Sequence, residues 1–176
     1  YRRKGKTTVA LGHDCRLSSP DFARHLSDGL RTTGCDVVCL ETVPTPLLYY
    51  SIYRFGYDAG IMITGSHNPP EYNGFKMMLG HETLFGDAIQ EILGIILKND
   101  FITGKQGKYS TINIVPDYQD YVVKDIDLKK PLKVVVDAGN GTGGVVAVPI
   151  FRRLNCEVIP LYCEMDGRFP HHHPDP

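Results

Sequence analysis

The clearest structural signal in the chain is Ala59-Gly60-Ile61-Met62-Ile63-Thr64, followed directly by Gly65-Ser66-His67-Asn68-Pro69-Pro70. The first six residues are almost wholly apolar, which is typical of a strand whose two faces are both covered in a parallel sheet. The next six are mainly turn-forming residues, and they place Ser66 just past the carboxyl end of this strand. Ligands of open α/β sheets bind at that edge, so we expect a site around Ser66.

Strand-like and helix-like patterns alternate on both sides of this stretch. Strands are predicted at 7–11, 35–40, 59–64 and 75–79, and helices at 18–33, 44–55 and 88–96. The alternation predicts an α/β fold with a mostly parallel, mixed sheet and helices on both of its faces. Residues 100–108 are rich in glycine and lysine, and we expect them to form a loop.

The first predicted helix has a clear start signal. Ser18-Ser19-Pro20-Asp21 offers a hydroxyl N-cap, a proline in the first turn and an acid near the positive end of the helix dipole. After these residues Phe22, Leu26 and Leu30 recur every four positions, which predicts one apolar stripe along the helix.

Three regions are predicted along the chain. Residues 1–115 form a first domain that contains the serine loop, and residues 116–130 form a connecting helix and a linker. Residues 131–176 begin a second α/β unit, with strands at 132–137 and 156–162, a glycine turn at 139–144 and a helix that ends near 154. Two strands and one helix are too few for a domain, so we expect this second unit to be incomplete.

Composition excludes several classes of protein. The chain has 176 residues, of which 42% are hydrophobic, and its 19 basic and 20 acidic residues give a net charge of −1. No basic tract is present to neutralise phosphates, so we expect no nucleic-acid partner. No apolar run approaches the roughly 20 residues of a membrane span. The five cysteines form no C-x-x-C pair, and buried thiols in a reducing, cytoplasmic setting are expected.

The residue types around Ser66 suit phosphoryl transfer. The prolines and turn formers would hold the hydroxyl outward, while His67 and Lys76 offer a proton relay and positive charge for a moving phosphoryl group. The alternative is a proline-rich turn with one surface serine. An esterase elbow is excluded because the second glycine of G-x-S-x-G is missing. Upstream, Asp14 and Arg16 either form a pair that braces this loop or belong to a simple turn.

The loop at 64–70, with Asn73-Gly74-Phe75-Lys76 behind it, resembles the active-site serine loop of the α-D-phosphohexomutases. Within that superfamily the chain is most similar to the bacterial phosphomannomutase/phosphoglucomutase group. The resemblance extends through Gly12-His13-Asp14-Cys15-Arg16-Leu17-Ser18, Pro44-Thr45-Pro46, Asp137-Ala138-Gly139-Asn140-Gly141 and Cys163-Glu164-Met165-Asp166-Gly167-Arg168-Phe169-Pro170. The serine loop is the long and specific motif among these.

The resemblance implies a phosphohexomutase that interconverts hexose 1-phosphates and 6-phosphates, with mannose and glucose phosphates as substrates. Ser66 would carry a phosphate and contact the essential Mg²⁺ through a phosphate oxygen. The phosphoserine would give its phosphoryl group to the sugar, and the bisphosphorylated intermediate would return the other group. His67 and Lys76 match the family's positions for proton transfer and charge stabilisation. Because a doubly charged phosphate would keep Lys76 protonated, His67 or a group elsewhere would share the role of base.

Much of the family's machinery is expected outside residues 1–176. The chain opens without a methionine and closes on Pro174-Asp175-Pro176 just after a predicted strand, so we expect a fragment. The metal-binding Asp-Gly-Asp-Gly-Asp-Arg loop, the sugar-recognition loop and a phosphate-binding domain would follow Pro176, and an arginine-bearing segment would precede Tyr1. The expected partners are a sugar phosphate and the remaining domains of the same protein, and this piece alone should be inactive.

The turn Gly139-Asn140-Gly141-Thr142-Gly143-Gly144 points to an alternative function. It matches G-x-G-x-x-G between a predicted strand and a helix, and Glu164 follows about 20 residues later, as in dinucleotide-binding folds. A non-catalytic nucleotide-binding module is the alternative, although Asp137 and Asn140 place polar groups where a pyrophosphate must approach. His171-His172-His173 offers a metal site or a tag remnant, but adjacent extended residues point to opposite faces, which favours a domain-packing segment.

Overall fold

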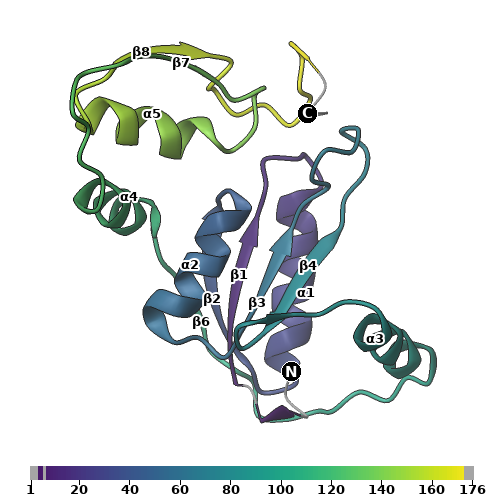
Figure 1. Cartoon of the computed structure of the whole chain (residues 1–176). Coiled ribbons are helices and arrows are strands. Elements are labelled where there is room, and N and C mark those ends of the chain that lie inside the picture. Colours follow the sequence, from purple (N-terminus) through teal and green to yellow (C-terminus); the bar gives the residue numbers. More distant parts are fainter. Residues whose placement is uncertain (1–3, 6, 173–176) are drawn as a thin grey trace.

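The computed structural model describes residues 4–5 and 7–172 of the chain. Its larger part is a six-stranded sheet in the order β5-β4-β3-β1-β2-β6 (Figure 1). The strands are β1 (Thr8–His13), β2 (Asp36–Thr42), β3 (Ala59–Ile63), β4 (Phe75–Leu79), β5 (Glu82–Thr83) and β6 (Tyr109–Thr111). β1, β2, β3 and β6 are parallel, whereas β4 is antiparallel to β3 and β5 to β4. The predicted mixed sheet is confirmed, and β5 and β6 are short strands that the sequence pattern did not indicate.

Helices cover both faces of this sheet, as predicted, with α1 (Ser19–Thr32) on one face and α2 (Thr45–Phe55) on the other (Figure 1). Side chains alternate along a strand. Val9 of β1 therefore joins a buried cluster with Ala23 of α1, while the next residue, Ala10, joins a second cluster with Leu48 of α2. All five residues of β3 are buried, which explains its unbroken apolar sequence. None of the helices in the described part of the chain has the length and apolar character needed to cross a bilayer.

The first turn of α1 differs from the prediction. Ser18 is the N-cap residue, but its backbone is helical, with φ −82° and ψ −18°, and its side chain makes no capping hydrogen bond. The hydroxyl of Ser18 instead accepts a hydrogen bond from Nδ2 of Asn73 at 3.0 Å, and the hydroxyl of Ser19 accepts another at 2.9 Å. The predicted hydroxyl cap is therefore wrong, because these two serines tie the helix to the loop that contains Ser66.

The predicted apolar stripe of α1 is correct for two of its three residues. Leu26 and Leu30 pack against the core, but Phe22 is 43% exposed and meets the ring of Phe75 edge-on at 6.0 Å. The buried residues of α1 are small: Ser19, Ala23 and Ser27. They recur every four positions on one helix face. Small side chains let the helix lie close to the sheet, and the larger Phe22 is left at its margin.

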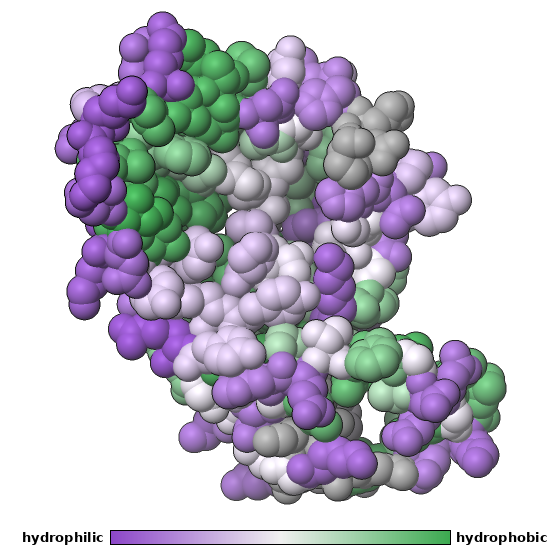
Figure 2. All heavy atoms as spheres, in the orientation of Figure 1, coloured by the Kyte–Doolittle hydropathy of each residue, from purple (hydrophilic) through white to green (hydrophobic). Residues whose placement is uncertain are grey.

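A second, smaller unit follows α4 (Val115–Lys124). β7 (Lys133–Asp137) and β8 (Glu157–Leu161) form a parallel pair joined by α5 (Gly144–Arg153), as the sequence pattern predicted. The face of the pair that α5 does not cover exposes Val135, Ile159 and Leu161. Figure 2 shows hydrophobic side chains gathered over this unit, at the upper left of the view. In the first unit, the helix α3 (Asp87–Leu97) has no buried side chain among the described residues.

One contact between α4 and α5 follows from a proline inside a helix. Pro149 lies within α5 and has no N–H, so it cannot bond to the carbonyl of Val145 four residues earlier. Nε2 of Gln119 in α4 donates to that carbonyl at 3.1 Å. The carbonyl that the proline leaves unbonded is therefore satisfied by the neighbouring helix, and the two helices are held together.

The cysteines are thiols. All five are free. Cys35, just before β2, and Cys39, within β2, are buried, as predicted. Cys15 and Cys163 are only partly buried. These two lie in the segments where the first and second units approach each other.

Candidate active site

The loop after β3 presents Ser66 to solvent. It leaves the sheet at Thr64, whose backbone N–H donates to the carbonyl of Gly74 at 2.9 Å and closes the base of the loop. Ser66 is exposed, and its φ of +54° is in the left-handed region, which is uncommon for residues other than glycine. The N–H of Ser66 donates to the Thr64 hydroxyl at 2.9 Å. The structure thus holds Ser66 in a strained, outward position.

Arg16 supports this loop from beneath. It is only 1% exposed. Its guanidinium donates to four backbone carbonyls of the loop: those of Ser66 (3.0 Å), Asn68 (2.8 Å), Tyr72 (3.1 Å) and Pro69. Its Nε donates to the carboxylate of Asp14 at 3.0 Å. All five N–H donors of the guanidinium are therefore used.

Asp14 joins the loop, Arg16 and the start of α1. One of its oxygens accepts hydrogen bonds from Nε of Arg16 and from the N–H of Gly65 at 3.2 Å. The other oxygen accepts from the hydroxyl of Ser19 at 2.6 Å and from the N–H of Arg16 at 3.0 Å. The predicted brace formed by Asp14 and Arg16 is confirmed, and the alternative of a simple turn is not.

Gly65 allows the loop to lie this close to Arg16. A Cβ at this position would stand 2.5 Å from Cζ of Arg16 and 2.6 Å from the carbonyl oxygen of Tyr72. Real Cβ atoms do not reach such distances, and neither neighbour can move without breaking the brace. The glycine next to Ser66 is therefore required by space.

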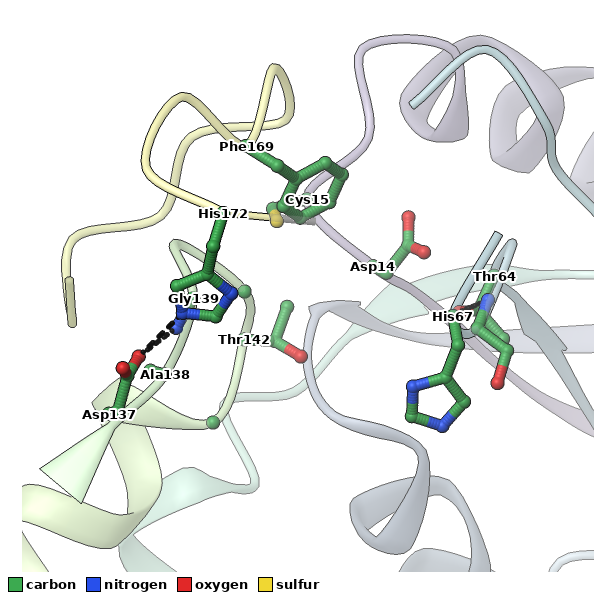
Figure 3. A pocket seen from close by; sticks show the side chains of 13 residues that line it. Asp14, Cys15, Thr64, His67, Asp137, Ala138, Gly139, Thr142, Phe169 and His172 are labelled. Carbon is green, nitrogen blue, oxygen red and sulfur yellow. Dashed lines mark hydrogen bonds and ion pairs between the residues drawn. The ribbon is translucent and has the colours of Figure 1, made fainter. Parts of the chain in front are cut away.

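A cavity of about 550 Å³ lies between the serine loop and the second unit (Figure 3). From the first unit it is lined by Asp14, Cys15, Thr64, Ser66 and His67. The opposite wall includes Asp137, Thr142 and His172. Nε2 of His172 lies 3.1 Å from a carboxylate oxygen of Asp137, drawn as a dashed line in Figure 3, and this contact lowers the pKa of Asp137. The site is thus formed by both units.

The three site residues predicted from the sequence are not all brought together. Ser66 and His67 both line the cavity, and Lys76 does not. Lys76 pairs with Met62 in the ladder between β4 and β3. Its neighbour Phe75 contacts α1, so Lys76 lies on the opposite face of the sheet, where α2 packs. The catalytic roles of Ser66, His67 and Lys76 stay predictions.

Cys15 lies at the junction of the two units. Its Sγ is 3.5 Å from the carbonyl oxygen of Asn140 in the second unit. Burial, and secondarily the carboxylate of Asp14, raises the pKa of the Cys15 thiol to about 11. A neutral thiol is a poor nucleophile at neutral pH, so the structure does not favour Cys15 as a reactive cysteine.

The glycine turn after β7 is already occupied by bonds within the protein. The N–H groups of Gly139, Asn140 and Gly141 donate to a carboxylate oxygen of Asp137 and to the carbonyls of Tyr162 and Ala138. A pyrophosphate at a G-x-G-x-x-G turn is held by N–H groups of this kind. Because these three donors are used, the geometry does not favour the nucleotide-binding alternative.

The described histidines of the 171–173 segment contact protein groups. Nδ1 of His171 lies 2.7 Å from Oδ1 of Asn140, and the ring of His171 stacks on Tyr162. His172 contacts Asp137, and His173 lies outside the described residues. Within residues 4–5 and 7–172, no group of three or more His, Cys, Asp or Glu side chains could hold a metal ion. These contacts of His171 and His172 lie within the second unit, so they do not test the predicted domain-packing role.

Sequence patterns did not identify several residues that shape the site. Asn73 donates to the hydroxyls of Ser18 and Ser19, and its Oδ1 accepts the N–H of Gly74 at 2.9 Å. Thr64 holds the N–H of Ser66. Asn before glycine signals a turn but not its partners. Ser18 and Ser19 lie 55 and 54 residues before Asn73, so no local pattern reveals that Asn73 bonds to them.

The fold and the serine loop define a class of α/β proteins that present a hydroxyl at the carboxyl edge of a mixed sheet. Two family models match the chain. Residues 1–103 match phosphoglucomutase/phosphomannomutase, alpha/beta/alpha domain I, and residues 116–176 match alpha/beta/alpha domain II of the same family. The chain therefore belongs to the phosphoglucomutase/phosphomannomutase family.

Individual proteins show the same likeness. The chain is 48% identical to a phosphoglucomutase of Neisseria meningitidis serogroup A and 48% identical to a phosphomannomutase/phosphoglucomutase of Pseudomonas aeruginosa, with 98% of the chain covered in each case. A solved structure of a phosphoglucomutase/phosphomannomutase family protein from Burkholderia thailandensis matches with a TM-score of 0.93, at 42% identity over 98% of the chain. The chain spans 38%, 37% and 39% of the length of these three proteins.

Proposed function

We propose that the full-length protein is a phosphohexomutase in which Ser66 carries the phosphoryl group between hexose 1-phosphates and 6-phosphates. The observation that supports this most is the way the loop holds Ser66. An exposed residue is kept at φ +54° by a buried arginine that binds four loop carbonyls. Strain of this kind persists only when surrounding contacts impose it, and it is concentrated at functional sites.

The chemistry requires two transfers through Ser66. In the first, a sugar hydroxyl attacks the phosphorus of phosphoserine, the bond from phosphorus to Oγ breaks, and a base takes the hydroxyl proton. In the second, Oγ of Ser66 attacks the other phosphate of the bisphosphorylated sugar, the bond from that phosphorus to the sugar oxygen breaks, and the sugar oxygen takes the proton back from the base. Positioning and electrostatic stabilisation carry most of the catalysis in phosphoryl transfer. In this protein, Arg16 fixes the loop and so positions Ser66 for the transfer.

His67 and Lys76 have different relations to this chemistry. His67 shares the cavity wall with Ser66, which supports a role for it in exchanging a proton with a bound sugar. Lys76 lies on the neighbouring strand and does not line this cavity, so a charge-stabilising role for it is supported by the family resemblance alone. A doubly charged phosphoserine would keep this amine protonated. We therefore assign the base role to His67 or to a group outside this chain.

The described residues do not form a complete site for the Mg²⁺ implied by the family resemblance. Mg²⁺ requires about six oxygen ligands in octahedral geometry. Ser66 would offer a phosphate oxygen, but the nearby carboxylate of Asp14 is engaged by Arg16, Ser19 and Gly65. Further ligands would have to come from parts of the protein beyond these residues. The same holds for sugar recognition, so the chain alone is expected to be inactive.

Replacing the proposed carrier tests the function directly. In the full-length protein, Ser66→Ala should abolish mutase turnover and remove a phosphate that intact-mass analysis maps to the serine loop. Ser110→Ala, an exposed serine on β6, is the matched control and should keep both. Normal turnover in Ser66→Ala would contradict the carrier role, and so would tight NAD binding by a protein whose Ser66 is never phosphorylated.

The preferred sugar is a separate question for the same assay. Relatives carry the names phosphoglucomutase and phosphomannomutase, so we expect turnover with glucose 1-phosphate and mannose 1-phosphate. Glucosamine 1-phosphate is the informative competitor, because it differs in charge at one ring position. Turnover restricted to glucosamine phosphate would keep the phosphohexomutase function and overturn the proposed substrates. The five free thiols fit a cytoplasmic enzyme.

A further inference from the structure

Residues 163–169, called here the docking loop, follow β8 and lie against the first unit. A Cβ on Gly167 would collide with the carbonyl oxygen of Cys15 and would stand 2.9 Å from the backbone nitrogen of Leu17. Only glycine fits where two backbones approach this closely. The docking loop therefore touches the segment that carries Arg16, the residue beneath the serine loop.

Phe169 adds a side-chain contact to this approach. Cζ of Arg16 lies 5.2 Å from the centroid of the Phe169 ring, within the range of a cation–π interaction. Figure 3 shows Phe169 beside Cys15 at the edge of the cavity. The φ of Phe169 is +48°, a conformation that bulky side chains rarely adopt. Surrounding contacts must impose this conformation.

Those contacts come from the second unit. Asn140 is 5% exposed, and its Nδ2 donates to the carbonyl of Glu164 at 2.9 Å. The N–H of Asp166 donates to the carbonyl of Asn140, and the N–H of Phe169 donates to the carbonyl of Asp166, both at 2.9 Å. Arg168 binds the carboxylate of Asp166 at 2.6 Å. The docking loop is therefore a fixed part of the second unit.

The arrangement leaves one way for the second unit to act on Arg16. All five N–H donors of the guanidinium are used in its plane by Asp14 and the serine loop. Its flat face remains available for stacking, and Arg16 lies over the ring of Phe169. The ring thus keeps the guanidinium from tilting away from the carbonyls without competing for any donor.

We propose that Phe169 is a positioning residue for Ser66, through which the second unit holds Arg16 and, with it, the serine loop. The catalytic consequence rests on the proposed function, whereas the effect on the loop does not. Phe169 also lines the cavity, but its proposed effect on Ser66 goes through Arg16. We therefore expect this effect in the order of the loop and in the rate of transfer more than in substrate affinity.

The test compares four forms of the full-length protein. Phe169→Leu removes the ring and keeps an apolar side chain, and Phe169→Tyr keeps the ring. Phe85→Leu changes a phenylalanine that is 79% exposed and serves as the matched control. Amide hydrogen exchange at Asn68 and Tyr72, whose N–H groups bond within the loop, reports its order. Steady-state kinetics reports kcat and KM separately.

In Phe169→Leu we expect faster exchange at both amides and a fall in kcat of about tenfold with KM unchanged, as the loss of one partly buried cation–π contact would give. Phe169→Tyr and Phe85→Leu should match the wild type in both readouts. Should Phe169→Leu melt early, Phe169→Met gives the same comparison, because it keeps the bulk and lacks a ring.

Unchanged exchange and unchanged kcat in the ringless variants would overturn the proposal. An equal loss in Phe169→Tyr would also overturn it, since the ring is retained there. The two proposals fail separately. If Ser66→Ala keeps its turnover while Phe169→Leu still loosens the loop, the carrier role of Ser66 is wrong and the positioning role of Phe169 stands.

Discussion

The serine loop after β3 and the glycine turn after β7 occupy the same place in their units, since each follows the carboxyl end of a parallel strand. They satisfy their backbone groups in different ways. The glycine turn bonds to its own residues and to the end of the next strand, for example from Gly141 to Ala138. The serine loop gives four carbonyls to Arg16, which is 50 residues away from Ser66 in the chain.

This difference separates a turn held by contacts of its own unit from a loop held by one distant buried side chain. The glycine turn also lines the cavity, but the N–H groups of Gly139, Asn140 and Gly141 are bonded within the second unit. A loop supported from beneath can keep an exposed residue in an unfavourable conformation, because the buried side chain contributes the stability that the loop lacks. The similar strand-and-turn pattern in the two units therefore does not imply similar roles. Three experiments test this contrast.

Removal of Arg16 should have the largest effect. Arg16→Ala leaves Asp14 without its buried cation and leaves four loop carbonyls without their donor. Breaking a buried ion pair from one side typically costs about 3–5 kcal/mol. Urea unfolding of the chain should therefore show a loss of that order, and hydrogen exchange should show the serine loop to be the first region to open.

An exposed arginine provides the control for this measurement. Arg24 pairs with Asp21 on the surface of α1, and both side chains are well exposed. Arg24→Ala should change the unfolding free energy by less than about 1 kcal/mol. If Arg24→Ala and Arg16→Ala cost the same, the serine loop does not depend on a buried support, and the contrast between the two turns fails.

Truncation of Asn140 tests the glycine turn and should have a smaller effect on the free energy of unfolding than Arg16→Ala. Asn140 and Asn155 both have φ of +60°, so glycine suits either backbone. Asn140→Gly loses the side-chain bonds to Glu164 and His171, and we expect a cost of about 1–2 kcal/mol in urea unfolding. Asn155 is exposed, and Asn155→Gly should stay within about 0.5 kcal/mol. Equal costs would show that the Asn140 side chain contributes nothing.

The smallest effect on the protein is expected for Cys15, which lies between the two turns and is tested by its rate of chemical labelling. Burial raises the pKa of Cys15 to about 11 from a value of 9.0 for an unperturbed thiol. At pH 8 its iodoacetamide labelling should be about a hundredfold slower than that of an unperturbed thiol, because the thiolate reacts. A raised pKa stabilises the fold fully below about pH 9, and this contribution is lost as the pH rises through about 11. Labelling of the Cys15 peptide as fast as free glutathione would contradict the burial.

Most of the fold could be predicted from the sequence because its signals are local. The apolar run of β3, the glycine after α1 and the prolines at the start of α2 are all visible without the structure. β6 could not be predicted. It has three residues, is exposed, and is a strand only because Tyr109 pairs with Val37 of β2. The domain boundary near residue 115 stays a prediction.

The candidate site was predictable only in its local part. Ser66 and His67 follow directly from the loop sequence, whereas the sequence left a pair between Asp14 and Arg16 and a simple turn as alternatives. The carbonyls that Arg16 binds lie 50 to 56 residues further along, and Phe169 comes from another unit, so no local pattern indicates them. Lys76 was proposed from its nearness to Ser66 in sequence and from the resemblance, and its position in β4 on the α2 face could not be derived from either.

The contact between Arg16 and Phe169 also has a consequence for the order of synthesis. The ribosome synthesises the chain from its amino terminus. Arg16 and the whole serine loop therefore leave the ribosome roughly 100 residues before Phe169. At about 5–20 residues per second this interval is about 5–20 s, which is long compared with the folding of a small domain. The nascent first unit can therefore build the support of its serine loop, and the second unit then closes over a part that is already in place.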